Sequence, residues 1–208
     1  MASNEDMKKQ LAEAYTRSAG KYGTTRNRKF DAFLEHEMDQ FICRVKKIGV
    51  RIVDLGSGPG NESVYFQAQG LQPICVDISA GMAQQCQKRE LQACMMDFYH
   101  LAFPNQFFAG AWMCFSLLHV PKKRCVDILQ EVYRVLVIGG ILHVALFEGE
   151  GEGPREEDRS KFGIARYFAY YKADELEAVL TPYFKVINIS RLNISPRPTL
   201  SIECSKKG

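Results

Sequence analysis

The order of short apolar runs along this chain of 208 residues is the feature that most constrains its fold. Runs of strand length recur, and segments of helical length separate them. The expected strands are 50–55, 72–77, 92–96, 108–115 and 140–147. Apolar residues at helical spacing are clearest over 30–45 and 122–136. Strands that alternate with helices predict an α/β fold with a mostly parallel sheet and helices on both faces.

The pattern changes after residue 147. The segment "EGEGEGPREED" (148–158) combines glycines with acidic residues and is expected to form an exposed loop. A helix is expected over 173–180, followed by strands over 184–192 and 199–204 that a short "NISPRP" link joins. These two strands predict a hairpin at the end of the chain.

Composition narrows the class of protein. The chain is 46% apolar and 25% charged, and its length suits one domain with additions. Its apolar runs stop short of the ~20 residues that a membrane span needs, and the first residues carry no apolar stretch typical of a secretory signal. A cytoplasmic protein with no membrane partner is therefore expected. The net charge of +3 does not favour a nucleic-acid partner.

The seven cysteines form no Cys-x-x-Cys pair. Most of them lie inside apolar segments, so they are expected to be reduced core residues, and no metal site is expected. The oligomeric state stays open.

The stretch "VDLGSGPGNE" follows the first expected strand and opens a helix-like segment. A glycine turn at this point lies at the carboxyl edge of the sheet, where ligands bind, and glycine lets a ligand approach the backbone. A nucleotide-like ligand is expected. A dinucleotide fingerprint would need Gly-x-Gly-x-x-Gly, whereas Gly56, Gly58 and Gly60 are spaced Gly-x-Gly-x-Gly, which argues against a nicotinamide cofactor. We expect Asp54 to hold the turn by accepting hydrogen bonds from its amides.

Acidic residues also follow the next two expected strands. Asp77 ends the second strand, where a carboxylate can accept hydrogen bonds from both hydroxyls of a ribose. Asp97 follows the third strand and lies beside Phe98 in the sequence. Phe98 could flank an adenine ring while the Asp97 carboxylate accepts a hydrogen bond from the exocyclic amine. Each acid alone also fits a solvated strand end or a helix cap. Acids at three successive strand ends beside a glycine turn are a more specific signal.

These residues resemble the class I S-adenosylmethionine-dependent methyltransferases, particularly the small ubiquinone-biosynthesis-like enzymes of the methyltransferase domain 11/25 type. The resemblance rests on "VDLGSGPGN", "VDIS" with Met82, "MMDF", "SLLHVP" and "RVLVIGGIL", over roughly 50–147. The chain departs from the family at Ala109 and Gly110, where Phe-Asp is usual, and at "VIGG", where Lys-Pro-Gly-Gly is usual.

The resemblance implies a Rossmann-like, seven-stranded sheet of order 3-2-1-4-5-7-6 with the seventh strand antiparallel. It implies one domain over 1–208, with a helical lid (1–48), a cofactor-binding core (49–147), and an acceptor-side segment with the terminal hairpin (148–208). The implied cofactor is S-adenosyl-L-methionine, and the implied product is S-adenosyl-L-homocysteine. The residues that the resemblance assigns to the cofactor are Tyr15, Tyr22, Asp54, Gly56, Ser57, Gly58, Asp77, Ile78, Met82, Asp97, Phe98, Cys114 and Phe115.

Within this set, the glycine turn, Cys114 and Phe115 are expected at the methionine part, and Met82 on one adenine face. The lid tyrosines Tyr15 and Tyr22 equally suit a helix that aromatic residues pack. No catalytic triad is expected, because a sulfonium methyl is already activated and the protein mainly aligns the nucleophile and excludes water.

The candidate catalytic residues are His119, Tyr22 and Arg166, and the expected acceptor is a small molecule with an O, N or C nucleophile. His119 is either a general base or a structural histidine of its loop. Arg166 either covers an anionic or planar acceptor or pairs with acids of 148–158. His143 is expected to be buried. Two alternatives stay open: a cofactor-binding protein without methyl transfer, and a methyltransferase that acts on RNA or protein.

Overall fold

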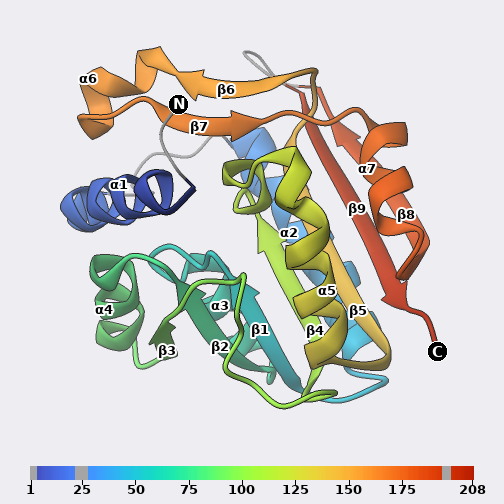
Figure 1. Ribbon diagram of the computed structural model, residues 1–208. Helices are drawn as coiled ribbons and strands as arrows, with labels where there is room; N and C mark the ends of the chain where they lie inside the picture. Colours follow the sequence, from blue (N-terminus) through green and yellow to red (C-terminus); the bar gives the residue numbers. More distant parts are fainter. Residues whose placement is uncertain (1–3, 22–27, 194–197) are drawn as a thin grey trace.

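A seven-stranded sheet forms the centre of the computed structural model, which describes residues 4–21, 28–193 and 198–208 (Figure 1). Its strands lie in the order β3-β2-β1-β4-β5-β9-β8. Their bounds are β1 (Arg51–Leu55), β2 (Gln72–Asp77), β3 (Gln92–Met95), β4 (Phe108–Cys114), β5 (Leu136–Phe147), β8 (Phe184–Leu192) and β9 (Thr199–Lys206). Strands β1 to β5 pair in parallel, and β9 is antiparallel to both β5 and β8.

The predicted fold class is confirmed. Counted within this sheet alone, the strand order is 3-2-1-4-5-7-6, with the seventh strand antiparallel. The chain differs by two further strands, β6 (Glu152–Arg155) and β7 (Arg166–Ala169), which form a separate two-stranded sheet. The last two strands of the large sheet are therefore the eighth and ninth along the chain.

Helices cover both faces of the sheet. Their bounds are α1 (Asn4–Ser18), α2 (Arg28–Val45), α3 (Asn61–Ala68), α4 (Ala80–Lys88), α5 (Cys125–Val135), α6 (Arg159–Phe162) and α7 (Ala173–Leu180), with short 3₁₀ turns over 19–21, 117–119, 122–124 and 156–158. Side chains alternate along β4: Trp112 packs with α2 and α3, whereas Met113 packs in the cluster that holds α5 and α7. Both faces of the strand are buried, which explains why its sequence is a continuous apolar run.

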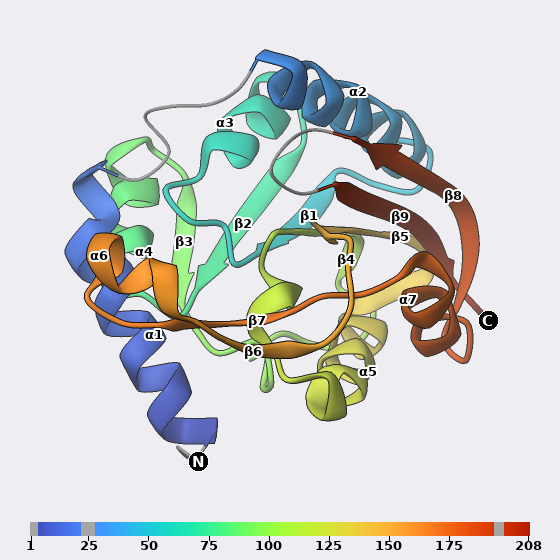
Figure 2. The ribbon, with the colours of Figure 1, turned by 90° about the horizontal axis from the view of Figure 1, so that it is seen from above.

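Much of the segment 148–158 is exposed, as its composition predicts, but the segment is not a loop. Glu152–Arg155 pairs with β7, and Asp158 is only 6% exposed. Its backbone hydrogen bonds go to a strand of the acceptor-side segment, and Asp158 is held by Arg166, so the polar composition is compatible with order. Figures 1 and 2 show β6 and β7 crossing over the carboxyl ends of the sheet strands, beside α1.

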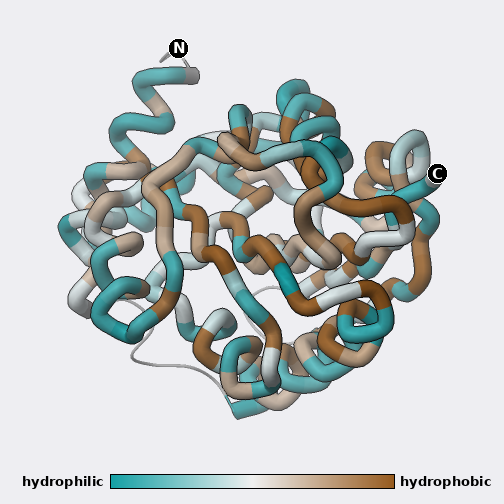
Figure 3. Tube along the Cα trace, turned by 90° about the horizontal axis from the view of Figure 1, so that it is seen from below, coloured by the Kyte–Doolittle hydropathy of each residue, from teal (hydrophilic) through white to brown (hydrophobic). Residues whose placement is uncertain are grey.

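Apolar residues concentrate along the central strands, and the outer helices carry alternating hydrophilic and hydrophobic residues (Figure 3). Of the cysteines, Cys75, Cys86, Cys125 and Cys204 are buried as expected, whereas Cys43 is exposed and two others are partly exposed. All seven are free thiols. Among the described residues, none of the helices combines the length and apolar character that crossing a bilayer requires.

Candidate active site

A cavity of about 800 Å³ opens at the carboxyl ends of the sheet strands. Its lining comes from α1, the turn after β1, the ends of β2, β4 and β5, and the β6–β7 sheet with α6. One half lies at the glycine turn and Asp77, and we call it the cofactor half. The other half lies at Phe115, Phe168 and Arg166, and we call it the acceptor half.

The glycine turn takes a conformation that other residues rarely adopt. Gly56, Gly58 and Gly60 have φ values of 75°, 54° and 79°. A Cβ added to Gly56 would lie 2.3 Å from the Cβ of Ser116, in the loop after β4. The amides of Gly56 and Ser57 donate to the Val76 carbonyl at 2.7 and 3.2 Å, which ties the turn to the end of β2. The turn therefore presents bare backbone to the cavity and leaves no room for side chains behind it.

Asp54 does not hold this turn as expected. Its carboxylate accepts a hydrogen bond from the Ser63 hydroxyl on α3 at 2.7 Å, whereas the turn amides of Gly56, Ser57 and Gly58 donate to partners on or beside β2. Burial raises the pKa of Asp54 well above its ordinary value. Asp54 thus links β1 to α3 beneath the turn.

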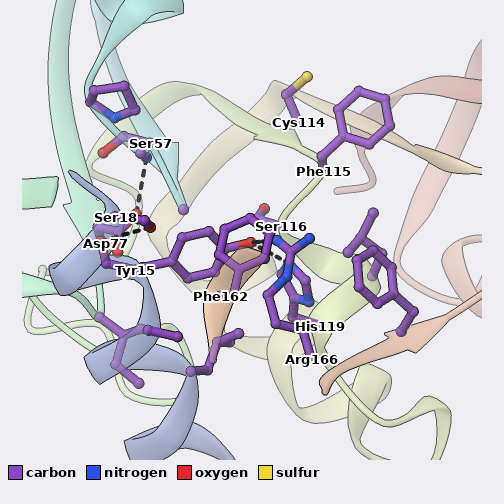
Figure 4. A pocket seen from close by; sticks show the side chains of 18 of the residues that line it. Tyr15, Ser18, Ser57, Asp77, Cys114, Phe115, Ser116, His119, Phe162 and Arg166 are labelled. Carbon is purple, nitrogen blue, oxygen red and sulfur yellow. Dashed lines mark hydrogen bonds between the residues drawn. The ribbon is translucent and has the colours of Figure 1, made fainter. Parts of the chain in front are cut away.

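Asp77 ends β2 and points its carboxylate at the cavity (Figure 4). Its oxygens accept hydrogen bonds from the Gly58 amide at 2.9 Å and the Ser79 amide at 2.8 Å. The residue is 8% exposed, and burial raises the pKa of its carboxyl to about 6, against the effect of these two amides. The amides fix the position of a carboxylate whose oxygens retain lone pairs for a ligand.

The end of β4 carries local backbone strain. Phe115 has a φ of 55°, a left-handed conformation that is costly for a bulky residue and is found mostly at functional sites. Its ring lies 4.9 Å from that of Phe147, measured between centroids. Phe168 of β7 adds a third ring, 6.4 Å from Phe147. The strained backbone thus directs Phe115 into an aromatic wall of the acceptor half.

A chain of hydrogen bonds crosses the acceptor half and joins α1 to β7 (Figure 4). Arg166 donates to Asp158 at 2.7 Å and to the Tyr15 hydroxyl at 2.6 Å. The Tyr15 oxygen lies 2.7 Å from Nε2 of His119, and Nδ1 of His119 lies 2.8 Å from the Tyr167 carbonyl. Because a carbonyl only accepts, Nδ1 carries the proton, Nε2 is bare, and Tyr15 donates to it.

The same surroundings keep His119 neutral. Burial among protein atoms lowers the pKa of His119 to about 3, and the nearby Arg166 charge contributes in the same direction. Both ring nitrogens are engaged, so the structure brings His119 to the cavity as a neutral member of a hydrogen-bonded chain rather than as an open base.

Comparison with known proteins relates part of this chain to a family. A methyltransferase domain model matches residues 52–140. This match, over the segment that holds the glycine turn and Asp77, supports a class I S-adenosylmethionine-dependent methyltransferase. The chain is 26% identical, over 68% of its length, to the tRNA 5-carboxymethoxyuridine methyltransferase of Escherichia coli, and 25% identical, over 65%, to the malonyl-[acyl-carrier protein] O-methyltransferase of Salmonella typhimurium.

The chain spans about half the length of these curated relatives, 56% and 52% respectively. Its fold is similar to that of the Burkholderia thailandensis 1,6-didemethyltoxoflavin-N1-methyltransferase, solved with 1,6-didemethyltoxoflavin and S-adenosylhomocysteine bound. That match has a TM-score of 0.73 at 18% identity and covers all of this chain and 92% of the other. The similarity of fold therefore includes the flanks that the domain model does not reach.

The cavity gathers most of the residues that the sequence analysis named. Those that line it are Tyr15, Gly56, Ser57, Gly58, Asp77, Ile78, Phe98, Cys114, Phe115, His119 and Arg166. Tyr22 lies outside the described residues. The roles assigned to all of these residues remain predictions.

Three other candidates lie outside the described lining. Asp54 is bonded to α3, and Met82 is 1% exposed within α4. Asp97 lies 2.7 Å from the ammonium of Lys8 on α1, and accepts from the Tyr99 amide. Because Met82 is buried and Asp97 is bonded to α1, neither reaches the lining, and their cofactor contacts stay predictions.

Sequence reasoning missed much of the acceptor half. Arg155, Lys161, Phe162 and Phe168 line the cavity. Arg155 lies in the segment 148–158 that was expected to be a loop, and the other three follow it in a stretch to which no cavity role was assigned. The signal that was available is the interleaving of basic and aromatic residues over 155–168, which the polar composition obscured.

Proposed function

We propose that this chain binds S-adenosylmethionine and transfers its methyl group to an O, N or C nucleophile of a small molecule. The observation that carries the proposal is that the glycine turn and Asp77 share one cavity of about 800 Å³ with the aromatic wall. A cavity of this size suits a cofactor with a small acceptor beside it.

The cofactor half fits the group chemically. Asp77 is a buried carboxylate whose oxygens can accept from the ribose hydroxyls. Gly56 lines the cavity with backbone alone, because Ser116 occupies the place where a Cβ would lie. Phe98 and Ile78 provide apolar surface for the adenine. When bound, S-adenosylmethionine supplies a methyl group on a positively charged sulfonium, and the faces of Phe115 and its neighbours attract such a cation.

The acceptor half positions the nucleophile and excludes water from it. The rings of Phe115, Phe147 and Phe168 wall it, and the Tyr15–His119 and Tyr15–Arg166 hydrogen bonds close α1 over it. Because transfer needs an aligned nucleophile and little water, these contacts are the chain's main contribution to the reaction. We propose Tyr15 and Arg166 as the closing pair, with His119 orienting Tyr15.

Cofactor consumption tests the proposal. The purified chain is incubated with S-adenosylmethionine and a panel of phenols, amines, carboxylic acids and unmodified tRNA, and S-adenosylhomocysteine release is measured. Turnover with a small molecule is expected. Binding without turnover on any substrate would favour a cofactor-binding protein without methyl transfer, and turnover on tRNA alone would favour an RNA methyltransferase.

The cytoplasm is the proposed location of this activity. All seven cysteines are free thiols, including the exposed Cys43, which suits a reducing compartment.

A further inference from the structure

Positive charge gathers at one end of the cavity. Arg17, Arg155, Lys161 and Arg166 all line it, from α1, β6, α6 and β7. The lining carboxylates, Glu62 and Asp77, belong to the glycine turn side.

These cations are not all neutralised by the chain itself. Arg166 pairs with Asp158 at 2.7 Å, and Arg155 pairs with Glu157 at 2.8 Å. Lys161 and Arg17 make no ion pair with any residue in the described part of the chain. Arg17 also lies close to the end of α6: its guanidinium is 3.7 Å from the position that a Cβ on Gly163 would take. Two unneutralised cations therefore flank the acceptor half, which favours an anionic ligand there.

The described side chains of the acceptor half include no available base. His119 uses Nδ1 toward the Tyr167 carbonyl and Nε2 toward the Tyr15 hydroxyl. Its lowered pKa, about 3, leaves little tendency to take up a proton at neutral pH. The Tyr15 oxygen in turn accepts a hydrogen bond from Arg166. The positive charge of Arg166 makes the uptake of a proton by His119 less favourable. An acceptor that must lose a proton during transfer would find no general base among these described side chains.

We infer that the acceptor is a carboxylate attached to a planar group, and that a carboxylate oxygen is the atom that receives the methyl group. The inference rests on the proposed function and names its substrate class. The stacked rings of Phe147 and Phe168, inclined by 26°, hold the planar part, and the guanidinium of Arg155 lies 5.2 Å from the Phe168 ring. Cations and aromatic wall thus meet at one place.

The chemistry balances without a base. A bond forms between a carboxylate oxygen and the methyl carbon while the carbon–sulfur bond breaks, and its electron pair remains on sulfur. The negative charge of the carboxylate and the positive charge of the sulfonium cancel, so the products are a neutral methyl ester and S-adenosylhomocysteine. No proton is transferred. The ester has lost the charge that the cations recognise, which favours its release.

A competing arrangement has the carboxylate as an anchor while another atom is methylated. Hydroxyaromatic acids separate the two, because each molecule offers both oxygens. The probes are 4-hydroxybenzoate and 6-hydroxy-2-naphthoate, each with its neutral primary amide as a matched control. We expect methyl esters, identified by mass spectrometry and by cleavage in mild alkali, and no product from the amides.

The pH dependence gives a second readout. Carboxylates with a pKa of about 4 are fully ionised above pH 6, so the rate is expected to be flat from about pH 6.5 to 9, whereas a phenol with a pKa of about 10 reacts faster as pH rises. Methyl ethers, or a rate that climbs through this range, overturn the inference. So does the failure of both acids to bind or react while calorimetry shows S-adenosylhomocysteine bound, a result that leaves the cofactor half of the proposed function standing.

Lys161→Glu tests the cations directly. The reversal is expected to raise the KM for the carboxylate about tenfold, since it replaces attraction by repulsion at a partly screened site, and to leave the affinity for S-adenosylhomocysteine within about twofold. Lys185→Glu, on exposed β8 away from the cavity, is the matched control and is expected to change neither. An unchanged KM in Lys161→Glu overturns the inference.

Discussion

The two halves of the cavity are built in different ways. The cofactor half comes from consecutive strand ends, and its polar contacts are backbone amides that fix one carboxylate, Asp77. The polar contacts of the acceptor half join α1 to β7, 151 residues apart at the Tyr15–Arg166 contact, and most of them run between side chains. A turn that depends on backbone conformation tolerates little substitution, whereas a network of side-chain hydrogen bonds can lose one residue at a time. The cofactor half should therefore respond abruptly to substitution and the acceptor half gradually.

The largest effect is expected from Gly56→Ala. The new Cβ would lie 2.3 Å from the Cβ of Ser116. Gly56 also has a φ of 75°, a left-handed conformation that costs alanine about 1–2 kcal/mol even without the clash. We expect the affinity for S-adenosylhomocysteine to fall at least about a hundredfold, together with a loss of stability. Gly70→Ala is the control, because Gly70 has a similar φ of 82° but nothing within 4 Å of its Cβ. Calorimetry and melting curves on both variants separate the clash from the backbone strain, and equal behaviour of the two would argue against a tightly fitted turn.

Asp77→Asn is expected to weaken cofactor binding by about 10- to 100-fold, as the loss of a charge-assisted hydrogen bond of ~1.5–3 kcal/mol implies. The native affinity should also fall as pH drops through about 6, the raised pKa of this carboxyl, because binding needs the ionised form. Titrations from pH 5 to 8 should show this dependence in the native chain and not in Asp77→Asn. An affinity that is flat with pH in both proteins counts against the ribose assignment.

The Asp77 carboxyl should make the free energy of unfolding depend on pH in the opposite direction from the cofactor affinity. The folded pKa of about 6 exceeds the unfolded value of about 3.9, so the folded chain holds a proton that the unfolded chain releases between these values. The contribution of Asp77 to stability is therefore present below about pH 4 and is lost as pH rises through 6. Urea unfolding of the native chain and Asp77→Asn, compared at pH 5 and 7, measures the difference.

Smaller effects are expected in the acceptor half. Tyr15→Phe removes a hydroxyl bonded to both His119 and Arg166 but keeps the ring, so turnover should fall about tenfold, while the free energy of unfolding falls by about 1–2 kcal/mol. Arg166→Ala is a poorer test, because it leaves the buried Asp158 with only the more distant Arg155 at 3.6 Å and should cost up to about 3–5 kcal/mol of stability. A double-mutant cycle between Tyr15→Phe and His119→Gln should show coupling in turnover, and additive effects would mean that the two residues act separately.

The smallest effect is expected from Arg191→Ala. Arg191 pairs with Glu148 near the surface at 2.9 Å and is 47% exposed, so its contribution should lie within about 0–1 kcal/mol. Both turnover and cofactor affinity should stay unchanged. A marked loss of activity would mean that the acceptor half extends past β5 toward β8.

The same contrast explains what the sequence revealed. The cofactor half is local: "VDLGSGPGNE" and Asp77 follow strands that apolar runs identify, and parallel strands bring their ends together. The order of the sheet followed from the resemblance to the family. The acceptor half depends on long-range pairing, because nothing in "EGPR" indicates that it pairs with "RYFA". Burial of Asp158 by Arg166 is likewise a tertiary effect that no local pattern carries.

The arrangement of S-adenosylhomocysteine in a crystal of the complex tests the central claim most directly. The account predicts the ribose hydroxyls within hydrogen-bonding distance of the Asp77 carboxylate, the amino-acid part along Gly56–Gly58, and the sulfur facing the aromatic wall of Phe115. A ligand bound elsewhere, or one whose ribose lies away from Asp77, would contradict the account.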